Sequence, residues 1–276
     1  MHSMISLLEA ITFIENNLKG ELSVADVATS AYVSVPHLQR MFANVFQCSV
    51  GDYATKRKLC AAAQDLLATT LTITDVAFIY GYSGSEAFSR AFKRQFLKTP
   101  SAFRKQNRFV DLYPRLVLNP NKEHGGNGMT RKYDLTEIGA KILAAKGTYI
   151  LNVDVDNMDS INKEKGYDMG DLVLATTAAR LERSISPEMD FFRIGGDEFV
   201  VLTGSDDFAC AEAVAQSIVA LAEEEVGKDA SLFHFSLSVG IAKISADVAD
   251  PKTALEQSDA AMMVAKRKGK NGYASQ

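Results

Sequence analysis

Two short segments in the second half of the sequence end in paired carboxylates. Asp154 and Asp156 close an apolar run that begins at residue 148, and Asp197 and Glu198 follow two glycines. Carboxylates held close together without basic partners repel one another unless a hard divalent cation lies between them. If the two segments are neighbouring strands, the acids converge. The sequence then predicts a Mg²⁺ or Mn²⁺ site suited to phosphoryl or nucleotidyl transfer.

The elements around these acids must bring them together. Apolar runs of strand character alternate with segments of helical spacing, which predicts an α/β unit. Gly195 and Gly196 indicate a hairpin turn, and phosphate oxygens could approach their amides with no Cβ in the way. A hairpin favours a mostly antiparallel sheet with helices on one face or both over a purely parallel sheet. We expect strands at 148–154, 190–194, 199–202 and 232–244, and helices at 134–146, 170–183, 208–224 and 251–268.

The first half contains a repeat of about fifty residues. Residues 22–28 align with residues 71–77, and the segment that ends at Phe42 aligns with the one that ends at Phe92. Each copy has the pattern of two short helices around a tight turn, so an all-α unit is expected. Apolar residues recur at three- and four-residue spacing in the second helix of each copy, which predicts the buried set Leu38, Met41, Phe42, Phe88, Phe92 and Phe96.

Polar residues mark the start and the turn of each copy. Ser23 with Asp26, and Thr72 with Asp75, have the spacing of capping boxes at the first helix. Gly81 suits a positive φ in the second turn, where Tyr32 is the less favourable residue of the first copy.

Residues from about 8 to 105 resemble the AraC/XylS DNA-binding domain, on the strength of the segments 90–96 and 99–104. That resemblance implies two helix-turn-helix units that enter successive major-groove segments of double-stranded DNA. Arg, Gln and Glu can pair with guanine, adenine and cytosine respectively. The expected reading residues are Pro36, His37, Gln39 and Arg40 in the first copy, and Ser85, Glu86, Ser89 and Arg90 in the second. The expected phosphate contacts are Lys56, Arg57, Lys93, Arg94 and Lys98. The alternative is a helical bundle whose exposed charges are merely solvated.

An ordered series of motifs covers nearly the whole second half. It runs through Asp154-Val-Asp156, Asn162, 166–171, 193–199, 238–240 and 259–271. The series resembles the GGDEF domain of diguanylate cyclases, a family with a palm-like fold that condenses two GTP into cyclic di-GMP across a dimer. The resemblance therefore implies GTP or cyclic di-GMP as ligand and a homodimer formed through this domain.

The same resemblance assigns roles to individual residues. Asp154, the Val155 carbonyl and Asp197 would hold Mg²⁺ or Mn²⁺, and Glu198 with Asp197 would assist catalysis. Asn162 and Asp171 would hydrogen-bond guanine, since a carboxylate can accept from both its N–H and its amino group. The expected phosphate contacts are Gly195, Gly196, Lys266 and Lys270.

The sequence departs from the GGDEF pattern at positions that bear on activity. Asp159 stands where the family usually has Lys, which predicts weaker triphosphate binding. Lys270 stands where Arg is common, so the positive charge is kept but the two-pronged contact of a guanidinium with phosphate is lost. The family's Arg-x-x-Asp feedback site should start at Ser186 and is absent. Three hypotheses remain open: an active cyclase, a non-enzymatic nucleotide sensor, and a module that only dimerises.

Composition supports a two-domain cytoplasmic protein. Residues 1–120 carry 13 Lys and Arg against 9 Asp and Glu, within a chain that has 30 basic and 34 acidic residues. A basic first half suits nucleic acid. Three cysteines without CxxC spacing suit a reduced compartment, and no apolar run is long enough to cross a membrane. We expect a DNA-binding domain at 1–106, a linker at 107–130 whose apolar part could pack on either domain, and a GGDEF domain at 131–276.

Overall fold

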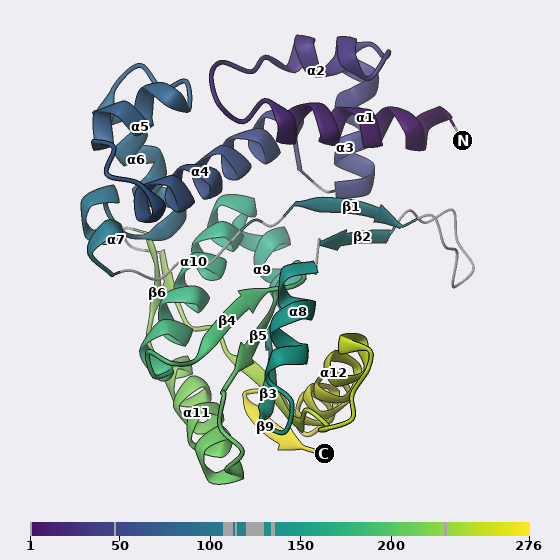
Figure 1. Cartoon of the computed structure of the whole chain (residues 1–276), viewed down its shortest axis with the longest axis vertical. Helices are drawn as coiled ribbons and strands as arrows, with labels where there is room; N and C mark the ends of the chain where they lie inside the picture. The colour runs from purple at the N-terminus through teal and green to yellow at the C-terminus, as the bar shows by residue number, and fades with distance from the viewer. Residues whose placement is uncertain are drawn as a thin grey trace. The chain divides into compact units, whose positions relative to one another are not determined.

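The structure is a computed structural model that describes residues 2–46, 48–106, 113, 115–119, 130–133, 136–228 and 231–276. The chain divides into two compact units, Met1–Asp134 and Leu135–Gln276 (Figure 1). We call them the N-terminal unit and the C-terminal unit. The first is mainly helical and the second is α/β, as the sequence predicts.

The predicted repeat is present in the N-terminal unit as two helix pairs. The first copy contains α2 (Val24–Ser30) and α3 (Val35–Phe46), and the second contains α5 (Ile73–Ile79) and α6 (Ser85–Phe96). A long helix, α4 (Val50–Ala68), joins the copies, while α1 (His2–Asn16) and α7 (Pro100–Gln106) flank them.

Both predicted capping boxes are formed. The Ser23 hydroxyl accepts from the Asp26 amide at 3.1 Å, and the Asp26 carboxylate accepts from the Ser23 amide at 3.3 Å. Thr72 and Asp75 make the same pair of bonds at 3.1 and 3.0 Å. Two backbone donors that have no partner within the helix are thus satisfied at the start of α2 and of α5.

The turns of the two copies share a left-handed residue but use different residue types for it. Gly81 has φ 76° and Tyr32 has φ 56°, so a tyrosine adopts the left-handed conformation in the first copy. A Cβ on Gly81 would lie 2.5 Å from the carbonyl oxygen of Gly20. The Gly20 amide donates to the Ile79 carbonyl at 2.6 Å. The loop before α2 therefore lies directly against the turn of the second copy.

Aromatic packing fills the interior of each copy. All six residues of the predicted buried set are less than 9% exposed, which confirms the helical spacing as a core signal. In the second copy the Phe92 ring lies 4.5 Å from the Phe96 ring and 5.2 Å from the Phe103 ring, centroid to centroid.

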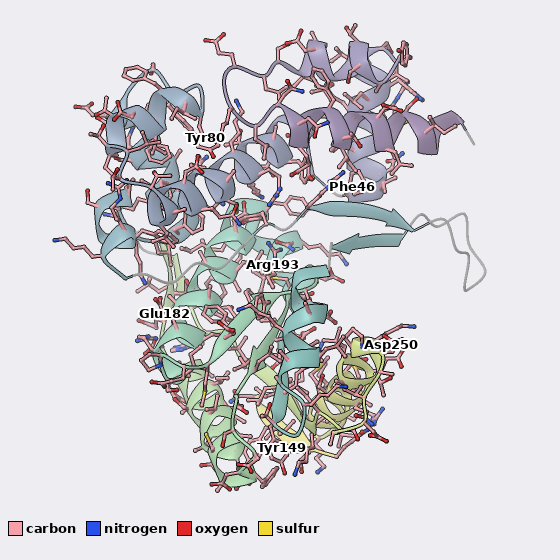
Figure 2. All side chains as sticks on the ribbon, in the orientation of Figure 1. Phe46, Tyr80, Tyr149, Glu182, Arg193 and Asp250 are labelled. Atoms are coloured by element: carbon pink, nitrogen blue, oxygen red, sulfur yellow. The ribbon has the colours of Figure 1, made fainter. Side chains whose placement is uncertain are left out.

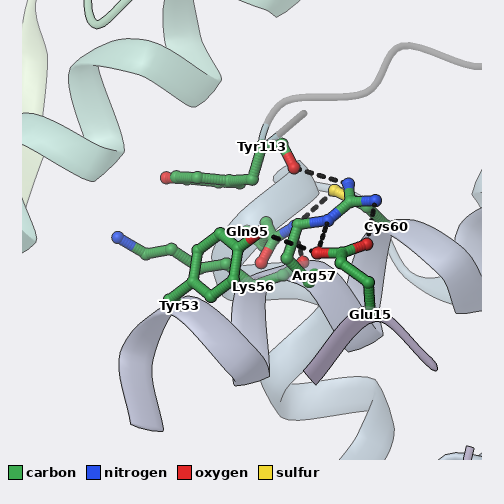
Figure 3. A network of polar contacts seen from close by, with 7 residues as sticks. All are labelled: Glu15, Tyr53, Lys56, Arg57, Cys60, Gln95 and Tyr113. Atoms are coloured by element: carbon green, nitrogen blue, oxygen red, sulfur yellow. Dashed lines mark hydrogen bonds and ion pairs between the residues drawn. The ribbon is translucent and has the colours of Figure 1, made fainter. Parts of the chain in front are cut away.

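Arg57 corrects one expectation, because its side chain is only 12% exposed and lies in an ion pair with Glu15. Its guanidinium makes a two-pronged ion pair with Glu15, Nε to Oε1 at 2.9 Å and Nη2 to Oε2 at 3.0 Å (Figure 3). Its Nη1 donates to the Tyr113 carbonyl at 2.6 Å, and Tyr53 donates to Glu15 at 2.7 Å. Lys56 lies beneath the Tyr113 ring. Arg57, which lies on α4, therefore connects that helix to α1 and to Tyr113 in the segment after α7.

The predicted linker contains ordered structure where it is described. Tyr113 packs on the N-terminal unit, which answers the question of where this part of the linker packs. Two strands, β1 (Leu116–Asn119) and β2 (Thr130–Tyr133), pair antiparallel. Residues 107–112, 114 and 120–129, including the predicted glycine-rich joint, lie outside the described residues.

A five-stranded sheet forms the centre of the C-terminal unit, in the order β4-β5-β3-β8-β9. Every neighbouring pair is antiparallel except β8 with β9. This confirms a mostly antiparallel sheet. The bounds of its strands are β3 (Tyr149–Val155), β4 (Asp190–Arg193), β5 (Glu198–Leu202), β8 (Leu237–Lys243) and β9 (Gly272–Ser275).

Helices cover both faces of this sheet. On one face, α8 (Thr136–Ala144) and α12 (Pro251–Arg267) pack on a core of β3, β5 and β8 residues that includes Ile150, Val200 and Ala242. On the other face, α11 (Phe208–Ala220) packs on β3 and β8, and α10 (Tyr167–Ser184) packs on α11. Asp154 shares the face of Ile150, because side chains alternate along a strand.

Three details differ from the expected elements. A short helix, α9 (Met158–Lys165), follows β3, and the last strand β9 follows α12. The segment 232–244, expected as one strand, forms two strands, β7 (Ser231–Phe233) and β8. β7 pairs with β6 (Val226–Lys228), which follows the short helix η1 (Leu221–Glu223). Between β7 and β8, the Phe235 carbonyl accepts from the Arg180 side chain at 3.2 Å. The Ser236 carbonyl accepts from the Asp156 amide at 3.0 Å, which continues the β3–β8 pairing by one residue.

None of the helices within the described ranges is long and apolar enough to cross a membrane.

Candidate functional site

The two acidic segments lie side by side at one end of the sheet. Asp154 of β3 is the cross-strand partner of Glu198 of β5, and the Val155 amide donates to the Asp197 carbonyl at 3.2 Å. The hairpin β4–β5 carries Asp197 and Glu198 to the point where β3 ends. The convergence that the sequence predicts for Asp154, Asp197 and Glu198 is therefore present.

Lys266 of α12 is paired with the innermost of these acids. Its Nζ lies 2.6 Å from Asp154 Oδ1, and the Asp154 side chain is only 6% exposed. Burial, reinforced by the charge of Asp197, raises the pKa of Asp154 to about 7 despite the lysine. Burial opposes the charge of Lys266, yet the bond to Asp154 prevails and raises the lysine's pKa.

The two acids at the hairpin, Asp197 and Glu198, also have raised pKa values. Burial raises the pKa of Asp197, and the carboxylate of Asp159 on α9 adds to the shift. Burial also raises the pKa of Glu198, and the negative charges of Asp259 on α12 and of Asp197 raise it further. Lys266 lowers both values but does not cancel the burial. The site therefore holds more negative charge than one lysine can balance.

This donor set fits a divalent cation by its chemistry. Carboxylates whose pKa values are raised by burial, and further by neighbouring acids, gain from a hard cation. A backbone carbonyl at Val155 is of the same ligand class. Among the described residues, no three acidic, histidine or cysteine side chains form a ready-made metal cluster. Lys266 holds Asp154 instead, so a cation would have to compete with that ammonium.

The hairpin tip is fixed by an arginine. Arg193, at the end of β4, donates to the Gly195 carbonyl at 3.1 Å and to the Gly196 carbonyl at 2.5 Å. Arg193 lies at the opposite end of the sheet from Tyr149 (Figure 2). A Cβ on Gly195 would lie 2.6 Å from Glu198 Oε2, whereas Gly196 faces open space. Of the two glycines, only Gly196 has open space where its Cβ would lie.

The expected guanine contacts come from two consecutive helices. Asn162 lies on α9 and Asp171 on α10, and both are partly exposed. A Cβ on Gly170 would lie 1.9 Å from Asn162 Oδ1, so the amide of Asn162 rests against the start of α10. The structure thus places Asn162 beside the residue that precedes Asp171. Asp159 lies on the same helix as Asn162, and its negative charge raises the pKa of Asp197 at the hairpin.

Two residues that the motifs include have positions that the sequence did not indicate. Lys270 donates to Asn157 Oδ1 at 2.5 Å at the end of β3. Asp156, grouped with the other acids by its spacing, adds its charge to that of Asp154 in raising the pKa of Lys266. It is 2% exposed, and its carboxylate accepts from Ser236, Ser238 and the Asn271 amide. Unlike Asp154, it is therefore held by neutral donors, and the expectation that it converges with the other acids on a cation is corrected by these bonds.

The expected reading residues of the N-terminal unit lie on the accessible sides of α3 and α6. Pro36, Gln39, Arg40, Glu86 and Arg90 are exposed, and the other three are partly exposed: His37, Ser85 and Ser89. Arg90 Nη1 is 3.9 Å from Glu86 Oε2, with both side chains more than three-quarters exposed. Such a pair is weak and leaves Arg90 able to turn towards another anion.

Comparison with known proteins assigns each half. Residues 27–106 match a family model described as a helix-turn-helix domain, and residues 134–272 match one described as "Diguanylate cyclase, GGDEF domain". The regulatory protein SoxS of Escherichia coli is 38% identical over 96 residues, which is 35% of this chain and 90% of that protein. This chain is a fusion of an AraC-type helix-turn-helix domain and a GGDEF domain.

Other relatives match one half each. The transcriptional activator AarP of Providencia stuartii is 33% identical over 96 residues, covering 35% of this chain and 71% of AarP. An EAL/GGDEF domain protein from M. capsulatus, known as a crystal structure, is 34% identical with a TM-score of 0.46. The match covers 51% of this fusion and 96% of that chain.

Proposed function

We propose that this AraC–GGDEF fusion is a cytoplasmic transcriptional regulator that binds double-stranded DNA and GTP. Its DNA-binding domain would span residues 1–106 and its GGDEF domain residues 131–276, with a linker at 107–130. The observation that carries the nucleotide part is the convergence of Asp154, Asp197 and Glu198 around Lys266. Acids with raised pKa values beside a lysine suit a triphosphate brought in with a cation.

Each residue of the site has a task in this proposal. Asp154, the Val155 carbonyl and Asp197 would hold Mg²⁺ or Mn²⁺, which when bound would offset the charge of the phosphates. The ammonium of Lys266 would leave Asp154 and pair with phosphate oxygens. The remaining contacts fall to residues at the edges of the site: Asn162 and Asp171 for guanine, and Gly195, Gly196 and Lys270 for phosphates.

The reaction that these residues suit is condensation of two GTP into cyclic di-GMP. Each ribose 3′ oxygen bonds to the α-phosphorus of the other GTP, and each GTP loses pyrophosphate. One domain offers one such site, so the reaction requires a homodimer with two sites facing each other. Burial raises the pKa of Glu198, which makes it a better acceptor for the proton of the attacking hydroxyl, with Asp197 beside it.

The direct test is turnover by the purified full chain. Incubation with GTP and Mg²⁺ or Mn²⁺ should yield cyclic di-GMP and two equivalents of pyrophosphate, separated by chromatography. Glu198→Gln should reduce the rate by about a hundredfold or more, as for loss of a general base. The exposed Asp206→Asn serves as the matched control. If the wild type forms no cyclic product, also when bound to DNA, the cyclase proposal is wrong.

One observation favours a second function, a nucleotide sensor without turnover. Lys266 occupies Asp154, and Asp159 adds negative charge beside Asp197, where a triphosphate would lie. In that case GTP binds without reaction, and its binding must change the affinity for DNA, because a ligand shifts states only through differential affinity. DNA affinity that is equal with and without GTP would exclude the sensor.

The DNA part of the proposal rests on the exposed polar faces of α3 and α6. Selection from a randomised duplex library should yield a preferred sequence. Arg40→Ala and Arg90→Ala should each weaken binding to it by about 1–3 kcal/mol and relax one base position. A uniform loss on all sequences would instead show that these arginines contact only phosphates.

A further inference from the structure

Asp156 joins three segments of the C-terminal unit that are far apart in the sequence. Its Oδ1 accepts from the Ser238 hydroxyl at 2.7 Å, and its Oδ2 accepts from the Ser236 hydroxyl at 2.7 Å. The same Oδ2 accepts from the backbone amide of Asn271 at 3.0 Å. Its own amide donates to the Ser236 carbonyl at 3.0 Å. This buried carboxylate is surrounded by donors and serves as the junction of β3, β8 and the segment after α12.

The segment after α12 has an uncommon backbone. Gly269, Lys270 and Asn271 have φ values of 122°, 64° and 44°, and Asn157 on the facing segment has φ 61°. Residues with side chains seldom adopt this left-handed region, and two in succession persist only where the surroundings enforce it. The bond from the Asn271 amide to Asp156 is such a constraint.

This backbone determines where Lys270 points. Its Nζ donates to Asn157 Oδ1 at 2.5 Å, which brings the ammonium across to the end of β3 that also carries Asp154. Asn157 directly follows Asp156 in the chain. If Asn271 left the left-handed conformation, the peptide that joins it to Lys270 would rotate and carry that lysine away from β3.

We infer that Asp156 is a positioning residue that acts through Lys270. By holding Asn271 in the left-handed region, it sets the affinity of the site for the phosphate end of a nucleoside triphosphate. Recognition of the base is left to other residues. The inference rests on the proposed binding of GTP.

The test compares GTP with GMP, both with Mg²⁺, by calorimetry on the full chain. Asp156→Asn keeps the shape of the side chain but replaces one carboxylate oxygen by a donor. It should weaken GTP binding by about tenfold or more, as for a lost hydrogen bond to a charged group, and leave GMP within about twofold. Lys270→Met should have the same effect. The double variant should bind no more weakly than Lys270→Met alone, because both changes remove one interaction.

A second pair of variants leaves Asp156 intact and covers the case in which Asp156→Asn does not fold. Asn271→Ala and Asn271→Gly remove the same side chain but differ in the cost of a positive φ. Asn271→Ala should bind GTP more weakly than Asn271→Gly and bind GMP equally well. Asn271→Gly should also restore GTP binding in the Asp156→Asn background. Asp206→Asn, an exposed change outside this network, is the control and should bind GTP normally.

The possible outcomes separate this inference from the function on which it rests. Equal GTP binding by wild type and Asp156→Asn, a parallel loss for GMP, or losses that add to those of Lys270→Met would overturn the role of Asp156 while GTP binding stands. Equal GTP binding by Asn271→Ala and Asn271→Gly would overturn it as well. A wild-type chain that does not bind GTP would overturn the proposed function, and this inference with it.

Discussion

The Nζ atom of Lys266 lies 2.6 Å from Oδ1 of Asp154, so the most buried acid of the site forms an ion pair with one lysine. The ammonium offsets part of the negative charge of the three carboxylates at this end of the sheet. In the proposed function, a nucleotide and its cation would have to displace it.

Asp154→Asn should reduce the pH dependence of stability. The pKa of Asp154 is raised to about 7 in the folded chain from 3.8, so the folded state holds this proton more tightly than the unfolded state. The associated stability is full below about pH 4 and is lost as the pH rises to about 7. Between pH 5 and 7.5, with EDTA, wild type should lose about 1–3 kcal/mol more unfolding free energy than the variant. Urea titrations measure this, with Asp206→Asn as control. Equal losses in wild type and Asp154→Asn would refute the raised pKa.

Gly81→Ala and Tyr32→Gly should have opposite effects, although they stand at matching places in the two copies. Alanine at residue 81 would meet the Gly20 carbonyl and a strained φ, and should lower the unfolding free energy by about 2 kcal/mol or more. Glycine at residue 32 relieves the left-handed tyrosine, whose side chain is 91% exposed, and should change stability by less than about 1 kcal/mol or raise it. Chemical denaturation of both variants decides. Similar destabilisation by both changes would mean that Tyr32 makes contacts of its own.

Arg57→Met should destabilise the N-terminal unit, in contrast to Arg90→Met. Loss of one partner from the largely buried Arg57–Glu15 pair leaves an uncompensated carboxylate, which should cost about 2–4 kcal/mol, somewhat less than for a fully buried pair. Arg90 is exposed, so its replacement should leave stability within about 0.5 kcal/mol and weaken DNA binding instead. Thermal unfolding and DNA titration of both variants separate the two roles. A stable Arg57→Met chain with reduced DNA affinity would return Arg57 to the phosphate contacts expected from its position in the sequence.

Ser23→Ala and Thr72→Ala should each lower the unfolding free energy by about 1 kcal/mol, the usual cost of an N-cap hydroxyl. The two hydroxyls cap corresponding helices with matching geometry, so the two losses should be similar. Thr70→Ala, at an exposed position beside the second cap, is the matched control. The expectation fails if this control is as destabilising as Thr72→Ala.

The sequence predicts features that depend on local spacing. The capping boxes follow from residues three apart, and the buried faces of α3 and α6 follow from a helical period. The hairpin at Gly195 and its convergence with Asp154 follow from two strands and a turn. In each case the residues that decide the structure are close together in the sequence or belong to one motif.

Features decided by long-range partners could not be predicted in the same way. Arg57 is of a residue type that often contacts phosphates. Only its partners Glu15 and Tyr113, which are distant in the sequence, show that it is held inside the N-terminal unit. Asp156 has the spacing of a metal ligand, but donors from β8 and the segment after α12 occupy it. Within the segment 232–244, the Phe235 carbonyl accepts from Arg180, a partner that lies 55 residues earlier in the chain.

The most direct test of a guanine nucleotide site in this DNA-binding protein is calorimetric titration of the full chain with GTP and with ATP, each with Mg²⁺. We predict that GTP binds and that ATP binds at least about tenfold more weakly, because Asp171 and Asn162 match the donors of guanine. We also predict that Asp171→Ala removes this preference. Equal binding of the two nucleotides would contradict guanine recognition by Asp171 and Asn162. No binding of either nucleotide would contradict the whole site and favour a GGDEF domain that only dimerises.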